Sequence, residues 1–267
     1  MRNIGRKFVG PLVVMGGFVA LWYVAAYNID NNFSPSSGRA LILPPPHRMF
    51  EGVNHSIGSE ILTAGRITLL TALTGLAVSI ALGWAIALIM GFSRSIESAL
   101  WPFLVALQAI PIVALVPLLI QLVGVNSRAR VVVVVLITLF PIVSGAVDGL
   151  NHVSRSHLEL FRLYGASRTS TMKHLRAPNA VPHAMGGVKV ASGLAVVGAI
   201  VGDFFFARGD LGLGRLITEY FQNTQPGPML LASGVAAILG LLFFSSVSVI
   251  AQQLSKRWSP QISSDVH

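Results

Sequence analysis

The residues best able to support chemistry gather in one polar stretch, residues 159–178, which reads ELFRLYGASRTSTMKHLRAP. It holds a single carboxylate and four basic side chains: Glu159, Arg162, Arg168, Lys173 and Arg176. Long apolar runs that belong in lipid lie on both sides, so the stretch is expected at a membrane surface. Basic and hydrogen-bonding side chains at this density suit two roles, contact with anionic lipid head groups or docking of another protein.

The local pattern of this stretch favours docking. Residues 158–164 have the composition of a short helix, and Gly165 follows where a helix end favours a left-handed residue. Ser167 is a predicted N-cap for a second helix that runs through Leu175, and Pro178 is expected to end that helix. Two short helices framing a glycine turn make a compact motif, which suits a protein partner better than a lipid surface.

The sequence gives little support for a catalytic site. The chain has no cysteine, which excludes disulfides, thiolate metal sites and cysteine nucleophiles. It has no G-x-x-x-x-G-K-[ST] phosphate loop, so it is not itself an ATPase. It also lacks an H-E-x-x-H helix, and no metal site is predicted from the spacing of the central histidines, His152, His157, His174 and His183. No clustered nucleophile and base can be assembled for a membrane-embedded enzyme.

The composition is that of a membrane protein. Of 267 residues, 53% are hydrophobic and 11% are charged, whereas soluble proteins carry roughly 25% charged residues. The net charge of +9 is divided among short patches, which leaves no continuous basic surface for nucleic acid. The sequence predicts an all-α, polytopic fold with about six transmembrane helices, because six apolar segments approach the roughly 20 residues that span a bilayer: 9–27, 67–92, 101–125, 131–150, 190–207 and 229–251.

The first apolar segment has two interpretations, and the positions of the basic residues predict the orientation of the chain in the membrane. Three basic residues precede the segment and residues 24–26 would serve as a cleavage site, so a signal peptide is one interpretation. The length of the segment favours an uncleaved anchor instead. With the N-terminus inside, most of the 19 Lys and Arg residues fall on the cytoplasmic side. Both termini and the polar stretch are therefore expected in the cytoplasm.

Several polar residues and prolines lie within the predicted spans. Asp203 is expected either to pair with Arg208 or to contribute to a gate, because a charge inside a span usually faces a partner or a cavity. Gln108 is expected to contact either substrate or a neighbouring helix. Pro111 and Pro117 free carbonyl groups, which is tolerated where a span lines a cavity. The candidates for a translocation path or gate are therefore Gln108, Pro111, Pro117 and Asp203.

Other membrane residues have structural interpretations. Asp148 lies near the cytoplasmic end of the fourth span, where it is expected to meet water or Arg155, with a role in transport as the alternative. Five glycines within the spans are expected at close helix contacts: Gly75, Gly83, Gly193, Gly198 and Gly202.

The polar stretch resembles the EAA loop of bacterial ABC importer permeases, written E-A-A, three residues, G, nine residues, I, any residue, L-P. Here residues 159–161 are ELF, Gly165 follows after three residues, and residues 175–178, LRAP, follow after nine more. The glutamate, glycine and proline match in register, while Leu160 and Phe161 replace the two alanines and Ala177 replaces the leucine. Residues 165–167, GAS, are similar to the GAS that many members carry.

The resemblance extends over about residues 61–254. Residues 110–117, with prolines at 111 and 117, resemble the proline-punctuated helix of the sulfonate, taurine and nitrate subgroup. Asp203 and residues 209–214, GDLGLG, resemble the acidic residue and glycine turn that close its fifth span. The resemblance implies three parts: an N-terminal anchor with an external proline-rich segment (1–60), a type I permease core with a cytoplasmic coupling loop at 151–182 (61–254), and a cytoplasmic tail (255–267).

The family implies how such a loop works. Its short helix sits in a groove of a cytoplasmic ATPase, and ATP binding rocks two permease chains between inward-open and outward-open states. The resemblance transfers this coupling role to eight residues: Glu159, Leu160, Phe161, Gly165, Ala166, Ser167, Leu175 and Pro178. It implies no cofactor in this chain, since ATP and Mg²⁺ are held by the ATPase.

The implied assembly sits in a bacterial inner membrane. It contains two ATPase copies, a second permease copy (most simply a homodimer, with a mixed pair left open) and an external binding protein. The subgroup implies a small solute such as a sulfonate, taurine or nitrate, and relatives that carry vitamin-precursor heterocycles remain open. The alternative is an ion-coupled secondary transporter, which would need ion sites near the membrane midplane.

Overall fold

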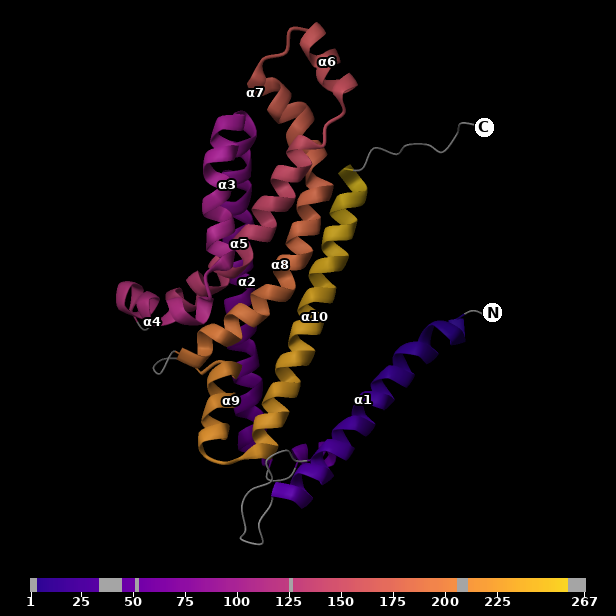
Figure 1. Cartoon of the computed structure of the whole chain (residues 1–267), viewed down its shortest axis with the longest axis vertical. Coiled ribbons are helices and arrows are strands. Elements are labelled where there is room, and N and C mark those ends of the chain that lie inside the picture. The colour runs from indigo at the N-terminus through magenta and orange to yellow at the C-terminus, as the bar shows by residue number, and fades with distance from the viewer. Residues whose placement is uncertain (1–3, 34–44, 51–52, 125–126, 206–210, 259–267) are drawn as a thin grey trace.

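The computed structural model describes residues 4–33, 45–50, 53–124, 127–205 and 211–258, and their regular structure is entirely helical (Figure 1). The all-α prediction is therefore confirmed for the described residues. In chain order the helices are α1 (Ile4–Phe33), the 3₁₀ helix η1 (Pro46–Phe50), α2 (His55–Phe92), α3 (Arg94–Ala109), α4 (Ile112–Val123), α5 (Ser127–Asn151), α6 (Arg155–Leu163), α7 (Arg168–Thr171), the π-helical turn η2 (Met172–Arg176), α8 (Ala177–Phe205), α9 (Leu213–Gln222) and α10 (Pro226–Trp258).

Among the described residues, four helical segments are long and apolar enough to cross a membrane: α2, α5, residues 168–204 and α10. The α3–α4 pair makes a fifth if the two bent helices are one span. The described residues thus account for four or five of the about six predicted spans. The first predicted span falls in α1, which lies apart from the bundle in Figure 1. Its described apolar part, Val13–Asn28, is shorter than a span, so that span stays a prediction.

The third predicted span, residues 101–125, is not one straight helix. Helix α3 ends at Ala109, α4 begins at Ile112, and the two axes differ by 93°. The cause is Pro111, which lacks an N–H group and disfavours helical backbone in the residue before it. Ile110 accordingly adopts an extended conformation with φ −72° and ψ 125°. Pro117, in contrast, lies inside α4 without ending it.

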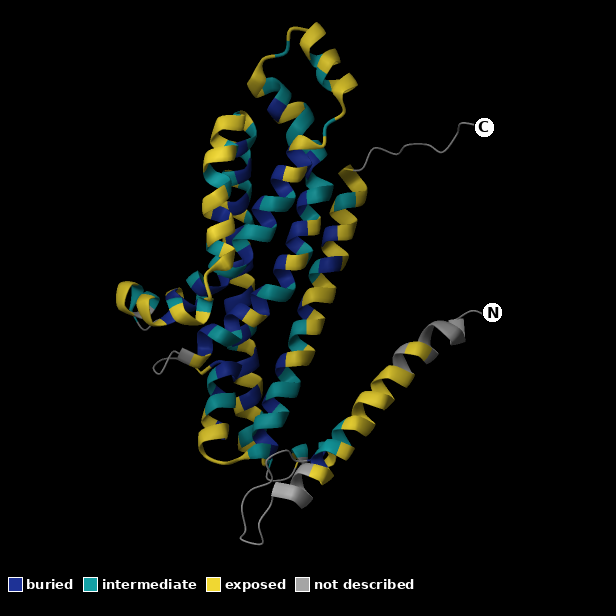
Figure 2. Cartoon of the chain, viewed as in Figure 1, coloured by how far each residue is buried: buried dark blue, intermediate teal, exposed yellow. Residues whose placement is uncertain are grey.

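The core of the bundle is formed by one face each of α2, α5, α8 and α10 (Figure 2). Leu76, Val134, Ala195 and Phe243, one from each helix, belong to a single buried cluster. The helix backbones approach closely where the sequence supplies small residues. A Cβ atom at Gly75 would overlap the Val134 side chain, and one at Gly83 would lie 2.6 Å from Ile142 Cγ2. The expected close packing is confirmed at these two positions.

Helices α5 and α8 make the closest contact that bears on the candidate site. A Cβ atom at Gly145 would lie 3.0 Å from the His183 carbonyl oxygen, and one at Gly149 would lie 2.7 Å from Ala180 Cα. A Cβ atom at Gly187 would collide with the carbonyl oxygen of Pro141. Backbone atoms cannot move aside as a flexible side chain does, so glycine is required at these contacts.

Two adjacent glycines of α8 allow a matched test of this packing. Gly187→Ala is expected to destabilise the chain by about 1–3 kcal/mol, because the new methyl group forces α5 and α8 apart. A Cβ atom at Gly186 would have no other atom within 4 Å, so Gly186→Ala is expected to leave stability unchanged or to raise it by up to about 1 kcal/mol through better helix propensity. Thermal unfolding of the two variants in detergent checks this. Equal midpoints would contradict it.

Candidate functional site

The polar loop that was predicted to be cytoplasmic begins with helix α6. Ser154 is its N-cap, and the Ser154 Oγ atom accepts a hydrogen bond from the His157 N–H group at 3.4 Å. The helix ends in a turn in which Gly165 has φ +68°. The Gly165 N–H group donates to the Arg162 carbonyl (3.0 Å) and the Ala166 N–H group to the Phe161 carbonyl (2.9 Å). This is the Schellman pattern of a helix C-terminus, so the predicted helix and glycine turn are confirmed.

The second helix of the loop begins where it was predicted. The Ser167 Oγ atom accepts a hydrogen bond from the Ser170 N–H group at 3.1 Å, which makes Ser167 the N-cap of α7. The helix then runs on through η2 and α8 to Phe205. The prediction that Pro178 ends it is wrong, and Pro182 also lies within α8.

The π turn η2 explains how the helix passes Pro178. The Ala177 N–H group donates to the Met172 carbonyl, five residues earlier, in place of the usual four. This wider turn directly precedes Pro178, whose ring would press on the carbonyl four residues back and which donates no hydrogen bond. A single helical path therefore joins the polar loop to the membrane span. Leu175 lies in η2 and Pro178 in α8 on this path, and both are half-buried.

The outer face of α6 is exposed and partly apolar. No residue of α6 is buried. Leu163 is 86% exposed, Tyr164 at the helix end is 83% exposed, and Leu160 is 46% exposed. Glu159 lies on the same helix and is also exposed, whereas Phe161 is half-buried. Leu160, Leu163 and Tyr164 therefore form an exposed apolar surface next to charged groups.

A basic groove lies beneath α6. It has a volume of about 1400 Å³ and is lined by residues of α2, α3, the end of α5, α6, α7 and η2. Five arginines and one carboxylate belong to its lining: Arg94, Arg155, Arg162, Arg168, Arg176 and Glu97. This end of the bundle therefore presents positive charge around the loop, which favours an acidic partner surface.

Arg176 ties the loop to the bundle at the base of this groove. Its Nη1 atom donates to the Gly91 carbonyl at 2.7 Å and its Nη2 atom to Asn151 Oδ1 at 3.4 Å. The Asn151 Nδ2 atom in turn donates to Glu97 Oε1 at 3.0 Å. This network joins η2 to α2, α3 and α5. The sequence pattern includes Arg176 in the motif but does not indicate its anchoring role.

The conformation of Gly165 predicts a local effect of substitution. Gly165→Ala adds no clash, since no atom lies within 4 Å of the new Cβ atom, but it places alanine at φ +68° at a cost of about 1–2 kcal/mol. The turn is therefore expected to open more often while the midpoint of global unfolding stays unchanged. Amide hydrogen exchange of residues 155–167 should increase. Gly165→Asn should fall between the parent and Gly165→Ala, and unchanged exchange in the alanine variant would contradict the prediction.

The second cluster lies at the opposite end of the bundle, around Asp203 on α8. Its carboxylate pairs with Arg130 of α5, with Nη1 and Oδ1 3.1 Å apart and side chains 6% and 0% exposed. The Thr68 hydroxyl of α2 donates to Asp203 Oδ2 at 3.0 Å and accepts from the Leu213 N–H group of α9 at 2.9 Å. One buried network thus joins four helices.

Two glycines of the predicted glycine turn make room for this carboxylate. A Cβ atom at Gly212 would collide with the Asp203 carboxylate, and one at Gly214 would collide with the Ile200 carbonyl oxygen. The Gly214 N–H group also donates to Asp203. The expected partner Arg208, with Gly209 and Asp210, lies outside the described residues. The structure instead gives Asp203 the partner Arg130, 73 residues earlier, which no local spacing could indicate.

Helix α9 is held on the bundle by a further polar contact. The Tyr220 hydroxyl donates to Glu60 Oε2 of α2 at 3.3 Å. Burial of the phenol, together with the negative charge of Glu60, raises the pKa of Tyr220 to about 12. The hydroxyl therefore keeps its proton at neutral pH and remains a donor to Glu60.

The candidate path residues do not form one cluster. Gln108 is exposed near the C-terminal end of α3, Pro111 lies at the break before α4, and Pro117 is exposed within α4. Asp203 is buried in its ion pair. Their assignment to a translocation path stays a prediction.

Comparisons with known proteins agree with this geometry. Residues 58–259 match the model of the family described as binding-protein-dependent transport system inner membrane component. The chain is 32% identical over 231 residues to the formylaminopyrimidine transport permease protein of Halalkalibacterium halodurans, across 86% of this chain and 88% of that protein. It is 30% identical over 253 residues to the putative aliphatic sulfonates transport permease protein of Escherichia coli, across 94% and 92%.

A solved structure shares the fold. A chain from the inward-facing MetNI methionine ABC transporter superposes with a TM-score of 0.63 at 13% identity, covering 78% of this chain and 100% of that chain.

Proposed function

This chain belongs to the family of binding-protein-dependent transport system inner membrane components, and we propose that its helix α6 couples a cytoplasmic ATPase to the movement of a solute. As the permease of an ABC importer for small solutes, it is a multi-pass inner-membrane protein and not an enzyme. ATP is bound by a separate ATPase subunit, as the family implies.

One observation carries the coupling role: an exposed apolar helix end is connected to a membrane span through one hydrogen-bonded turn and an unbroken helical path. Leu160, Leu163 and Tyr164 offer the docking surface, while Glu159 and the surrounding arginines offer polar contacts. A displacement of α6 passes through the Gly165 turn into α7, η2 and α8. The hydrogen bonds of Arg176 hold η2, near the start of this helical path, against α2, α3 and α5.

The Asp203 network lies at the other end of this helical path, near the C-terminus of α8. Because Asp203 lies on α8 and pairs with Arg130 on α5, a movement of α8 is passed to the outer part of the bundle. Discrete packing of this kind favours two arrangements over a continuous deformation. The outer segment Leu213–Gln222, held by Thr68 and Glu60, is the surface that faces the external binding protein.

The working assembly contains two copies of this chain, two ATPase copies and an external binding protein. Support for a second copy comes from α4, which projects from the bundle in Figure 1. Its apolar residues Val113, Leu118 and Leu122 are 52%, 49% and 73% exposed. The end of α10 lies at the same end of the bundle as α6, which supports a cytoplasmic C-terminus, and the N-terminus is assigned to the same side.

The transported solute is a small polar molecule, and a pyrimidine-type vitamin precursor is the first candidate. The relative with 32% identity is named for formylaminopyrimidine, and the relative with 30% identity is named for aliphatic sulfonates, which makes a sulfonate the second candidate. Ion-coupled transport has little support. Asp203 is the one buried carboxylate among the described residues, and its pairing with Arg130 does not favour the protonation cycle that proton coupling needs.

Purification and reconstitution test this function. The tagged chain is purified in mild detergent from cells that express its neighbouring genes, and co-purifying proteins are identified by mass spectrometry. An ATPase and a binding protein are expected. The assembly is then placed in liposomes with ATP inside, and uptake of a formylaminopyrimidine and of an alkanesulfonate is compared. Uptake that runs on an ion gradient without ATP would overturn the proposal.

A further inference from the structure

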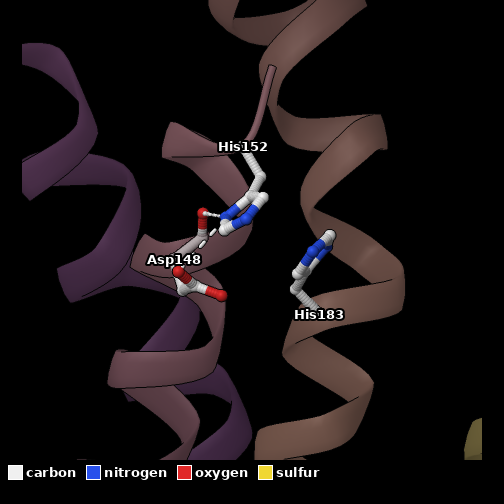
Figure 3. Close-up of side chains that lie close together, drawn as sticks. All are labelled: Asp148, His152 and His183. Carbon is white, nitrogen blue, oxygen red and sulfur yellow. Dashed lines mark hydrogen bonds and ion pairs between the residues drawn. The ribbon is translucent and has the colours of Figure 1, made fainter. Parts of the chain in front are cut away.

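Three side chains that the sequence pattern does not connect meet where α5 ends and α8 begins (Figure 3). Asp148 lies in the last turn of α5, His152 directly follows that helix, and His183 lies on α8. One ligand atom from each residue can be chosen so that all three lie within 4.8 Å of one another. The sequence alone predicts water or Arg155 as the neighbour of Asp148 and no metal site among the histidines.

The contacts within this trio hold the groups in place. The His152 Nδ1 atom lies 3.2 Å from Asp148 Oδ1 and 3.1 Å from the Asp148 carbonyl oxygen. The His183 ring stacks on the His152 ring, with centroids 4.8 Å apart and planes inclined by 27°. Two basic rings thus lie face to face beside one carboxylate. Because the lone pair of each ring nitrogen lies in the plane of its ring, the two rings must turn before both nitrogens face one ion.

His183 supplies an independent indication of a ligand. Its Nδ1 atom is buried and has no hydrogen-bond partner among the described residues. A buried ring nitrogen without a partner is uncommon in folded proteins, and an unoccupied ligand position is one explanation for it. The carbonyl oxygen of His183 lies next to Gly145, so the close α5–α8 contact fixes the backbone that carries this ring.

We propose that Asp148, His152 and His183 form a binding site for a divalent transition-metal ion of the zinc type. Two imidazoles and one carboxylate are a donor set that zinc prefers, whereas Mg²⁺ and Ca²⁺ prefer oxygen ligands. Two ligands at about 2.1 Å from a tetrahedral ion lie about 3.4 Å apart, so the side chains must rotate to bring their ligand atoms, now within 4.8 Å of one another, to that separation. The fourth position is open to water.

The position of this site gives the ion a structural role. The ion would join the end of α5 to α8 at the base of the loop that carries α6. Since the two backbones already touch at Gly149 and Ala180, the ion would stabilise this contact without moving the helices. The site is separate from the α6 surface and does not depend on the coupling role proposed above.

Zinc binding by the full-length chain tests the site. The chain is purified with a tag that contains no histidine, stripped with a chelator and titrated calorimetrically with Zn²⁺. One equivalent is expected to bind and to raise the thermal unfolding midpoint, while Mg²⁺ has no such effect. His183→Ala and His152→Ala are expected to lose the binding, and Asp148→Asn to weaken it at least tenfold. Co²⁺ in place of Zn²⁺ should give visible absorption bands typical of imidazole ligation.

Two other histidines serve as matched controls. His157 and His174 lie in the same loop region and are exposed, but neither belongs to the trio. His157→Ala and His174→Ala should bind Zn²⁺ as the parent does. The proposal is overturned if the parent binds no zinc, if His183→Ala binds it equally well while keeping the metal-free unfolding midpoint of the parent, or if the control variants lose it to the same degree.

Discussion

Asp203→Asn is expected to destabilise the chain by about 3–5 kcal/mol, because it leaves the Arg130 guanidinium buried without its counter-charge. The Asp203 and Arg130 side chains are 0% and 6% exposed, so neither group can turn to water. The same carboxylate accepts from Thr68 and Gly214, and its replacement weakens the attachment of α9 as well. The thermal unfolding midpoint and the yield of folded chain from membranes are the measurements.

A double variant separates the charge effect from the loss of packing. Arg130→Gln combined with Asp203→Asn leaves two neutral groups that can hydrogen-bond, so it is expected to recover part of the lost stability. Asp148→Asn is the control, since this carboxylate is exposed and its loss in the metal-free chain should leave the midpoint unchanged. A single Asp203→Asn variant as stable as the parent would show that the buried pair contributes little.

Leu163→Asp is expected to abolish capture of the ATPase and ATP-driven uptake while leaving the stability of the chain unchanged. Leu163 is 86% exposed at the end of α6, so the change removes no internal contact. It places a charge in the centre of the proposed docking surface, where an unpaired charge would be desolvated on binding. The measurements are the ATPase-to-permease ratio after affinity purification and the rate of uptake in liposomes.

The matched control is Phe221→Asp. Phe221 is 70% exposed on α9, at the opposite end of the bundle from α6. This variant should capture the ATPase as the parent does, and any loss should appear only in the step that requires the binding protein. If Leu163→Asp retains the ATPase at the parental ratio, α6 is not the docking element. If both variants lose it, the effect is a general one of added charge.

The loop shows how far local sequence signals extend. Ser154 and Ser167 cap helices, and Gly165 adopts the left-handed conformation, because each depends only on hydrogen bonds within a few residues. The same local reasoning failed at Pro178. A proline was expected to end the helix, but a π turn and the packing of α8 on α5 outweigh the lost hydrogen bond.

The membrane spans likewise separate what the sequence predicts from what only the structure shows. Length and hydropathy identified α2, α5, α8 and α10, because the cost of an unpaired backbone group in lipid makes every long apolar run helical. They did not show that α3 and α4 meet at 93°, nor that the helical path which contains α8 begins at Arg168, in α7. Hydropathy reports which residues prefer lipid and carries no information on where a helix bends.

By itself, the sequence determined the class of the protein, the helical nature of its membrane segments and the two short helices around the Gly165 turn, since all three follow from composition and short-range patterns. Only the tertiary structure decided that Asp203 pairs with Arg130, that Arg176 binds Gly91 and Asn151, and that His183 stacks on His152. These contacts join residues 25 to 85 positions apart. Their formation depends on how closely glycines let the helices approach, and that distance is a property of the packed bundle.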